Sequence, residues 1–207
     1  TQGRGWERFA MVKARVINDD NSQDVKWLKS ILHPFTFRRY LDFTTLDALR
    51  NMKKLIATEI RRRRLSNNIK LGAGGIREVE FFAQSFQLIH GGREPALQSK
   101  SLLRALDALT ELDIVERDVT QQLKSDYLFL RKVEHTLQQA QDRQTQTLPE
   151  LPWQQAALIE VMGFDSFSEF LVHLDTVMAR IHAHFNELVE ESHDTHSEED
   201  QLFTACQ

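Results

Sequence analysis

The sequence predicts an all-α protein: an antiparallel bundle of roughly five or six long helices with a short helical lead-in. Three observations predict this class. Only 8 glycines and 4 prolines interrupt the 207 residues. Apolar residues recur at spacings of three and four, which is typical of amphipathic helices, and no alternating run is long enough for a sheet. With a hydrophobic fraction of 41% and a mean hydropathy of −0.43, the chain has the composition of a soluble globular protein.

The first third of the chain predicts three helices. The first covers residues 6–17, and a polar stretch after it caps a short second helix that runs to Leu32. We expect Pro34 to stop that helix, because the residue before a proline avoids the α conformation. A variant capping box predicts a longer third helix over residues 44–65.

The remaining two thirds predict five more helices. Apolar periodicity places four of them over residues 76–90, 102–112, 119–137 and 153–162. A capping box formed by Ser166 and Glu169 opens the last one, whose core stripe runs from Phe167 to Leu188. The acidic and poorly periodic segment that follows is expected to be disordered. We therefore predict a lead-in over 1–18, a helical bundle over 19–190 and a disordered tail over 191–207.

Composition also narrows the class of function. A net charge of −4 and a pI near 6.1 argue against a nucleic-acid-binding protein. The single cysteine, Cys206, excludes a disulfide framework and fits the cytoplasm. No apolar run approaches the ~18 residues of a membrane span, and no signal peptide is visible. Because the chain begins without methionine, we interpret it as a segment of a longer protein.

The most unusual segment is the glycine-rich stretch before the helix predicted at 76–90. It holds three glycines within four positions: Gly72, Gly74 and Gly75. The free N–H groups and the dipole at a helix N-terminus favour an anion, and Lys70 and Arg77 add positive charge. On composition alone, an ordinary interhelical turn followed by a solvated Arg–Glu pair is favoured over a phosphate site. Arg77, Glu80 and Gln84 are expected to share a polar face opposite the core stripe.

Other charged segments carry weaker signals. Arg8 and Arg15 share a face of the first helix, so they could bind phosphate, although ordinary basic surface residues fit equally well. Lys13 points elsewhere on a regular helix. The run Arg61–Arg64 complements the dipole at a helix C-terminus. Eight histidines without a nearby Cys or carboxylate cluster do not suggest a zinc site.

Several segments together resemble one family, that of the bifunctional glutamine synthetase adenylyltransferase/adenylyl-removing enzymes. The matching segments lie, in order, at residues 6–15, 68–81, 91–95, 127–131 and 145–149. The resemblance covers nearly the whole chain from Gly5 to about Glu191. It looks most like the first of that family's two related halves, in which the glycine segment continues into Arg-Glu-(Ile/Val)-Glu-Phe, as it does at 77–81. The uridylyltransferases of the PII signal protein carry a related Gly-Gly-(Leu/Ile)-Arg segment.

The resemblance implies a particular reaction. The first half of those enzymes removes AMP from adenylylated glutamine synthetase by phosphorolysis and releases ADP, whereas the other half attaches AMP from ATP. Paired aspartates in a nucleotidyltransferase domain hold Mg²⁺ for this chemistry, and that motif is absent from this chain. We therefore expect no catalytic residue and no metal ligand here, an inactive isolated chain, and no tightly bound Mg²⁺, ATP, ADP or phosphate. Residues 1–18 would then be the end of the nucleotidyltransferase domain.

The same resemblance implies which residues line the nucleotide or phosphate cleft. The candidates are Arg8, Lys13 and Arg15 from the lead-in, and Lys70, Gly72, Gly74, Gly75, Arg77, Glu78 and Glu80 from the helical side. Expected partners are adenylylated glutamine synthetase, the preceding catalytic domain and, as a further candidate, the PII signal protein. Neither nucleic acid nor membrane is expected. The main alternative is a non-catalytic docking module for glutamine synthetase or PII; a nucleic-acid-binding domain built around Arg61–Arg64 is disfavoured by the net charge.

Overall fold

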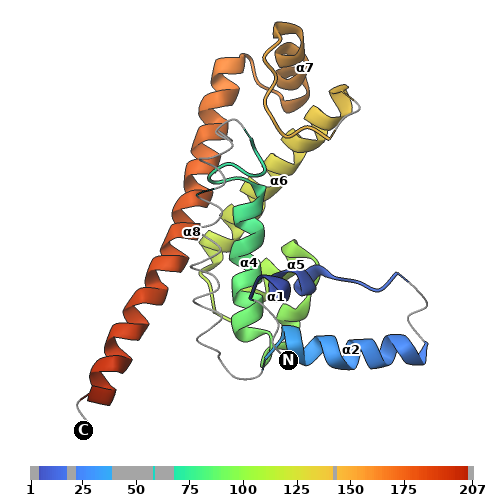
Figure 1. The fold of residues 1–207 in the computed structure, drawn as a ribbon. Coiled ribbons are helices and arrows are strands. Elements are labelled where there is room, and N and C mark those ends of the chain that lie inside the picture. The colour runs from blue at the N-terminus through green and yellow to red at the C-terminus, as the bar shows by residue number, and fades with distance from the viewer. Residues whose placement is uncertain (1–4, 18–21, 39–57, 59–67, 142–143, 205–207) are drawn as a thin grey trace. The chain divides into compact units, whose positions relative to one another are not determined.

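The described part of the chain is helical (Figure 1). The computed structural model describes residues 5–17, 22–38, 58, 68–141 and 144–204, without the side chains of 140, 141 and 189–204. Its elements are α1 (Gly5–Lys13), α2 (Gln23–Thr36), α4 (Ile76–His90), the 3-10 helix η2 (Pro95–Gln98), α5 (Leu102–Glu111), α6 (Arg117–Gln141), α7 (Pro152–Met162) and α8 (Phe167–Thr204). Over these residues the only β-type pairing is an isolated antiparallel bridge between Asn68 and Thr147. The predicted all-α class is confirmed.

The chain forms two compact units. The first consists of Thr1–Leu55 and Glu80–Thr120, and the second of Ile56–Val79 and Gln121–Gln207. The predicted domain boundary after residue 18, the run Arg61–Arg64 and, apart from helical Thr58, the helix predicted at 44–65 lie outside the described residues, so they stay predictions.

The first unit has a small aromatic core. Phe9 and Val12 of α1 are buried with Leu88 of α4, and Phe81 packs against them. The rings of Phe9 and Phe81 meet edge to face with centroids 5.9 Å apart, a favoured geometry for aromatic pairs. The apolar residues whose spacing predicted α1 thus lie on the face that this helix buries.

Helix α2 does not end where the sequence predicts. Ser22 caps its start as expected, since the Ser22 hydroxyl accepts a hydrogen bond from the Val25 amide at 3.2 Å. However, the helix passes through Pro34 and ends at Thr36, so the stop predicted at Pro34 is wrong. A proline removes one hydrogen bond, here to the carbonyl of Ser30, and an exposed carbonyl in a last turn can bond water instead.

The η2 helix in the first unit was not predicted, because a four-residue element carries no periodicity. Its position depends on Gln87, a buried residue of α4. The Gln87 amide nitrogen donates to the carbonyls of Leu97 at 2.5 Å and Ser99 at 2.7 Å. The helix that follows, α5, matches the predicted range 102–112 closely.

The second unit is built on two long helices whose predicted stripes are confirmed. The buried residues are Leu123, Leu130, Val133 and Leu137 on α6, and Phe170, Leu174, Val177, Ile181 and Phe185 on α8. Helix α8 begins at the predicted capping box. It continues to Thr204, so helix stands where the sequence predicted a disordered tail. Glutamate-rich sequence is a good helix former, and adding a turn to an existing helix avoids the cost of nucleation.

The polar face predicted for α4 is also wrong in part. Arg77 is exposed and Glu80 is half-buried, but Gln84 is only 7% exposed. Ser85 and Gln87 are buried as well, so α4 is covered on more sides than an amphipathic surface helix. A pattern of polar residues at helical spacing does not reveal this, because a buried glutamine can satisfy its amide within the protein.

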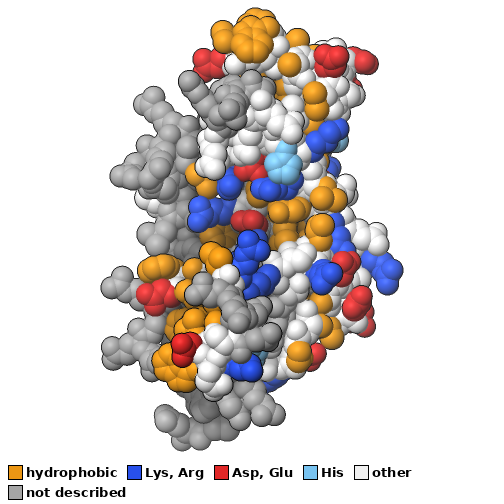
Figure 2. All heavy atoms as spheres, turned by 90° about the vertical axis from the view of Figure 1, so that its right-hand side faces the viewer, with side chains coloured by type: hydrophobic (Ala, Val, Ile, Leu, Met, Phe, Trp, Pro, Cys, Tyr) orange, Lys and Arg blue, Asp and Glu red, His pale blue; other side chains and the backbone are white. Residues whose placement is uncertain are grey.

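The surface of the second unit is apolar around α7. Leu158 is the one buried residue of that helix, whereas Trp153 is 62% exposed and Val161 54%. Figure 2 shows hydrophobic side chains among charged ones on one face of the described residues. None of the helices in the described ranges is both long and apolar enough to span a membrane.

Candidate functional site

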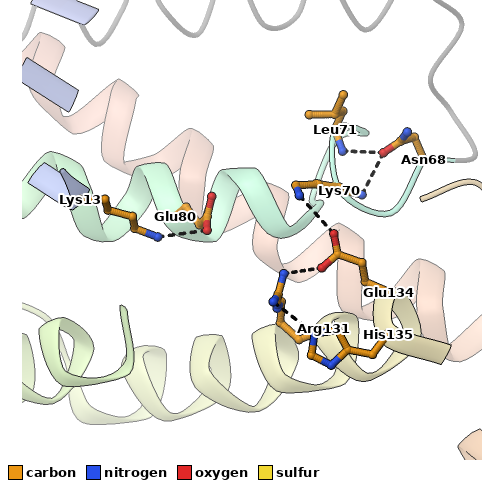
Figure 3. A network of polar contacts seen from close by, with 8 residues as sticks. All are labelled: Lys13, Asn68, Lys70, Leu71, Glu80, Arg131, Glu134 and His135. Atoms are coloured by element: carbon orange, nitrogen blue, oxygen red, sulfur yellow. Dashed lines mark hydrogen bonds and ion pairs between the residues drawn. The ribbon is translucent and has the colours of Figure 1, made fainter. Parts of the chain in front are cut away.

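The glycine-rich segment is a tight turn organised by Asn68. The Asn68 side-chain oxygen accepts hydrogen bonds from the Lys70 amide at 3.0 Å and the Leu71 amide at 2.8 Å (Figure 3). The Asn68 carbonyl accepts from the Gly72 amide at 2.8 Å. An asparagine that bonds the backbone two and three residues ahead is a common way to fix a turn. Lys70 therefore projects from a rigid backbone.

The first amides of α4 already have protein acceptors. The amide of Ile76 donates to the carbonyl of Ile69, and that of Arg77 to the carbonyl of Lys70, both at 3.1 Å. The third amide, that of Glu78, donates to Gly75 at 3.0 Å. An anion at a helix N-terminus relies on free N–H groups. This geometry supports the interpretation of the segment as an interhelical turn and leaves anion recognition to the side chains.

Gly74 and Gly75 are required by close backbone contacts. Gly74 has a φ of +72°, and a Cβ atom there would collide with the backbone of Met178 on α8. A Cβ atom on Gly75 would lie 2.8 Å from the carbonyl oxygens of both Ile69 and Lys70. The two glycines therefore let the turn pack directly on α8 and on itself.

Glu78 holds the same turn from the other side. Its carboxylate is buried, accepts a hydrogen bond from the Gly74 amide at 2.8 Å, and lies 3.0 Å from Nδ1 of His182. A buried carboxylate needs such partners, since an uncompensated charge is costly away from water. Glu78 thus ties the glycine turn to α8.

Lys70 forms an ion pair with a second buried carboxylate. Its Nζ lies 3.2 Å from Oε1 of Glu134 on α6, and Arg131 bonds the other oxygen of the same carboxylate (Figure 3). The Glu134 side chain is 1% exposed. Arg131 also donates to Nε2 of His135 at 3.2 Å. One buried acid therefore fixes two cations from different segments.

The candidates of the lead-in lie in the first unit. Arg8 is buried and donates to the carbonyl of Thr36 at 3.2 Å. Lys13 pairs with Glu80 of α4 at 3.0 Å, and both side chains are about one third exposed. Because α1 ends at Lys13, Arg15 is exposed beyond the helix and does not share a helical face with Arg8. That part of the prediction is wrong.

The structure thus brings Lys13 and Glu80 together in one unit, and places Lys70, the glycines, Arg77 and Glu78 in the other. Sequence reasoning missed Asn68, Arg131, Glu134 and His182 as parts of the candidate site. A signal was available for Arg131, which ends one of the segments that carry the family resemblance. No signal identified Glu134, since a glutamate on a helix is ordinarily exposed.

The buried carboxylates described in the second unit are engaged by basic side chains and are not grouped as Mg²⁺ ligands. Among the residues that the structure describes there, the buried carboxylates are Glu78, Asp126 and Glu134, and each contacts a basic side chain. Asp126 forms a bidentate pair with Arg180 at 2.7 and 3.2 Å, and the bond to this carboxylate raises the pKa of Arg180. Within the described ranges no three His, Cys, Asp or Glu side chains are grouped to hold a metal ion.

Comparison with known proteins identifies the class to which this helical region belongs. The family model of the GlnD PII-uridylyltransferase matches residues 50–189, more than half of the chain, so the chain belongs to that family. Within it, the chain is 89% identical over 206 residues to the bifunctional glutamine synthetase adenylyltransferase/adenylyl-removing enzyme of Alteromonas mediterranea. That alignment covers 100% of this chain and 21% of the relative, so the chain spans about a fifth of the relative's length. The predicted resemblance to the bifunctional adenylyltransferase/adenylyl-removing enzymes is confirmed.

Proposed function

We propose that this chain is the helical region of the adenylyl-removing half of a bifunctional enzyme that adenylylates and deadenylylates glutamine synthetase. The observation that carries the proposal is the 89% identity to such an enzyme along the whole chain. The run Arg77-Glu78-Val79-Glu80-Phe81 favours the adenylyl-removing half. That half removes AMP with inorganic phosphate and releases ADP.

In this proposal the chain forms one wall of the nucleotide and substrate cleft and supplies charge without a metal ligand. Arg77 and Lys70 act as the contacts to phosphate, because one is exposed and the other is partly exposed on a fixed turn. Glu78 and the glycines position that turn. In the first unit, exposed Arg15 and partly exposed Lys13 are the accessible candidates, while Arg8 and Glu80 hold α1 in place.

Mg²⁺ and ATP then serve the enzyme through a nucleotidyltransferase domain that carries the paired aspartates. Adenylylated glutamine synthetase is the proposed substrate, PII a further proposed partner, and the cytoplasm the proposed location. The described residues of this chain contribute binding and orientation.

Replacing Arg77 with alanine in the full-length enzyme tests the cleft role. We expect the rate of AMP removal to fall at least tenfold, about 1.4 kcal/mol of transition-state stabilisation, with the melting temperature nearly unchanged because the side chain is exposed. Arg104→Ala, which removes an exposed arginine of α5, is the matched control and should leave the rate unchanged. Unaltered turnover in Arg77→Ala would refute the cleft role.

The apolar surface of α7 favours a second candidate function, docking of glutamine synthetase or PII without a part in the active site. Exposed Trp153 is a residue type enriched in protein interfaces, and exposed Val161 adds to the apolar surface of the same helix. Measurements of KM and kcat distinguish the docking function from the cleft function. If docking is the role, Trp153→Ser raises the KM for adenylylated glutamine synthetase, or weakens PII binding, and Arg77→Ala has no effect on kcat.

A further inference from the structure

The cluster around Glu134 holds more positive charge than its buried acid requires. Lys70 Nζ contacts Oε1 of Glu134 at 3.2 Å, and Nη1 of Arg131 contacts Oε2. One cation neutralises a buried carboxylate, whereas this carboxylate has two. The group of three side chains therefore keeps a net charge of about +1.

Both cations also present part of their surface to solvent. The Lys70 side chain is 36% exposed and that of Arg131 is 35% exposed, against 1% for Glu134. A lysine ammonium has three N–H donors and a guanidinium has five. The contacts described above use one donor of Lys70 and two of Arg131, those to Glu134 and His135. Counting only contacts within the part of the chain that the structure describes, donors of both kinds remain at an accessible surface.

The two cations are held in place before any ligand arrives. The Lys70 amide is bound by Asn68, and its carbonyl accepts from the Arg77 amide at 3.1 Å, so both sides of this residue are fixed. At the far end of each side chain, Glu134 restrains the charged group (Figure 3). Side chains that are already ordered lose less conformational entropy when a ligand binds. The hydrogen bond from the Arg77 amide to the Lys70 carbonyl also brings the backbone of Arg77, a third cation, next to that of Lys70.

The other two buried carboxylates among the described residues of the second unit have their own partners. Glu78 is engaged by Gly74 and His182, and Asp126 by Arg180 and Gln122. The remaining neighbour of Arg131 in the cluster, His135, accepts a hydrogen bond from it at Nε2. The accessible charge of the cluster is therefore positive.

We propose that Lys70 and Arg131, positioned by Glu134, form a binding site for a phosphate group. The ligand is either inorganic phosphate or the terminal phosphate of a nucleoside diphosphate, which both present the oxygens that an ammonium and a guanidinium bind best. The inference rests on the proposed function in one respect: phosphorolysis consumes phosphate and releases a nucleoside diphosphate. It adds Arg131 as a ligand-binding residue and Glu134 as the residue that positions both cations.

Phosphate binding to the 207-residue chain tests the inference directly. Inorganic phosphate and ADP are titrated separately by calorimetry at constant ionic strength. We expect Lys70→Gln and Arg131→Gln each to weaken binding at least tenfold. Lys132→Gln, which removes an exposed lysine one residue further along α6, is the matched control and should bind as the wild type does. Circular dichroism verifies folding, and if Arg131→Gln does not fold, Lys70→Gln decides.

Each outcome has a definite meaning. Binding of phosphate alone supports a free-phosphate site, and binding of ADP with competition by phosphate supports a site for the terminal phosphate. Absence of binding by both probes, or equal loss in Lys132→Gln, overturns the inference. Equal affinity in the wild type and both cluster variants overturns it as well.

A second assay separates this inference from the proposed function. In the full-length enzyme, Lys70→Gln should raise the KM for phosphate at least tenfold in AMP removal. If the enzyme removes no AMP while the chain binds phosphate through these residues, the proposed function fails and the site stands. If AMP removal is normal and its KM for phosphate is unchanged in both variants, the site fails and the proposed function stands.

Discussion

Gly74 and Met178 approach so closely that no side chain fits between the glycine turn and the backbone of α8. The turn precedes α4 and carries Lys70, and α8 supplies His182, which contacts the carboxylate of Glu78. A contact between two backbones leaves little freedom for either segment. The geometry of the candidate site therefore depends on the absence of a side chain at Gly74.

Substituting Gly74 with alanine should destabilise the protein strongly. The new methyl group meets both a positive φ and the Met178 backbone, so we expect a loss of about 3 kcal/mol in the free energy of unfolding. Gly163, with a φ of +79° and no atom within 4 Å of the point where a Cβ would lie, is the matched control. Gly163→Ala should cost about 1 kcal/mol, from backbone strain alone. Equal losses in urea denaturation would contradict this account.

The capping box of α8 makes a local prediction. The Ser166 hydroxyl accepts from the Glu169 amide at 3.1 Å, and the Glu169 carboxylate accepts from the Asp165 amide at 3.3 Å. Ser166→Ala should lower the free energy of unfolding by about 1 kcal/mol, because one amide of the first turn loses its acceptor. Ser166→Asp keeps an acceptor and should restore most of the loss. A stability unchanged in Ser166→Ala would show that water replaces the cap.

His90 predicts a pH dependence of stability. Partial burial lowers its pKa from the ordinary value of 6.5, and Arg93 acts in the same direction while Glu94 opposes it. The unfolded chain therefore takes up a proton at a higher pH than the folded protein. As pH falls from 6.5 through the folded pKa, the stability contributed by neutral His90 is lost, and above 6.5 it is fully present.

Denaturant titrations at about pH 5 and about pH 8 measure this effect, on either side of the ordinary histidine pKa. His90→Gln should show a smaller fall in stability between the two conditions than the wild type. His184→Gln, which changes a histidine of α8, controls for the general effect of losing a titratable ring. The same fall in His90→Gln and the wild type would refute the assignment.

The Lys13–Glu80 pair predicts a measurable coupling between α1 and α4 in the first unit. Both side chains are about one third exposed, so solvent screens the charges and we expect a coupling of about 0.5 kcal/mol. A double-mutant cycle with Lys13→Ala and Glu80→Ala measures it, and high salt should reduce it further. Additive effects of the two substitutions would show that the pair does not contribute.

The helices were predictable because their signals are local. Ser166 and Glu169 marked the start of α8, and the apolar stripes of α6 and α8 identified the residues that are buried. The α2 helix was predicted too short, since its end depends on whether an exposed carbonyl near Pro34 can bond water. The same kind of local reasoning missed η2, which is fixed by the distant Gln87.

The candidate site was less predictable because burial is a tertiary property. Lys70 and Arg77 stood out by their place around the glycines, but the acid that fixes Lys70 lies 64 positions away. Nothing local distinguishes Glu134 from an exposed helical glutamate. The sequence also predicted that Gln84 lies on an exposed polar face, whereas its side chain is buried by packing. Only the contacts between segments far apart in the sequence show which residues are buried and hold the site in place, and which are exposed to a ligand.

The most direct test of the proposed function compares the two opposing activities of the full-length enzyme in Arg77→Ala. Removal of AMP from adenylylated glutamine synthetase and attachment of AMP from ATP are measured on the same preparation. If this chain is part of the adenylyl-removing cleft, the ratio of removal to attachment falls at least tenfold while attachment keeps its wild-type rate. A parallel loss of both activities, or no change in either, would contradict it.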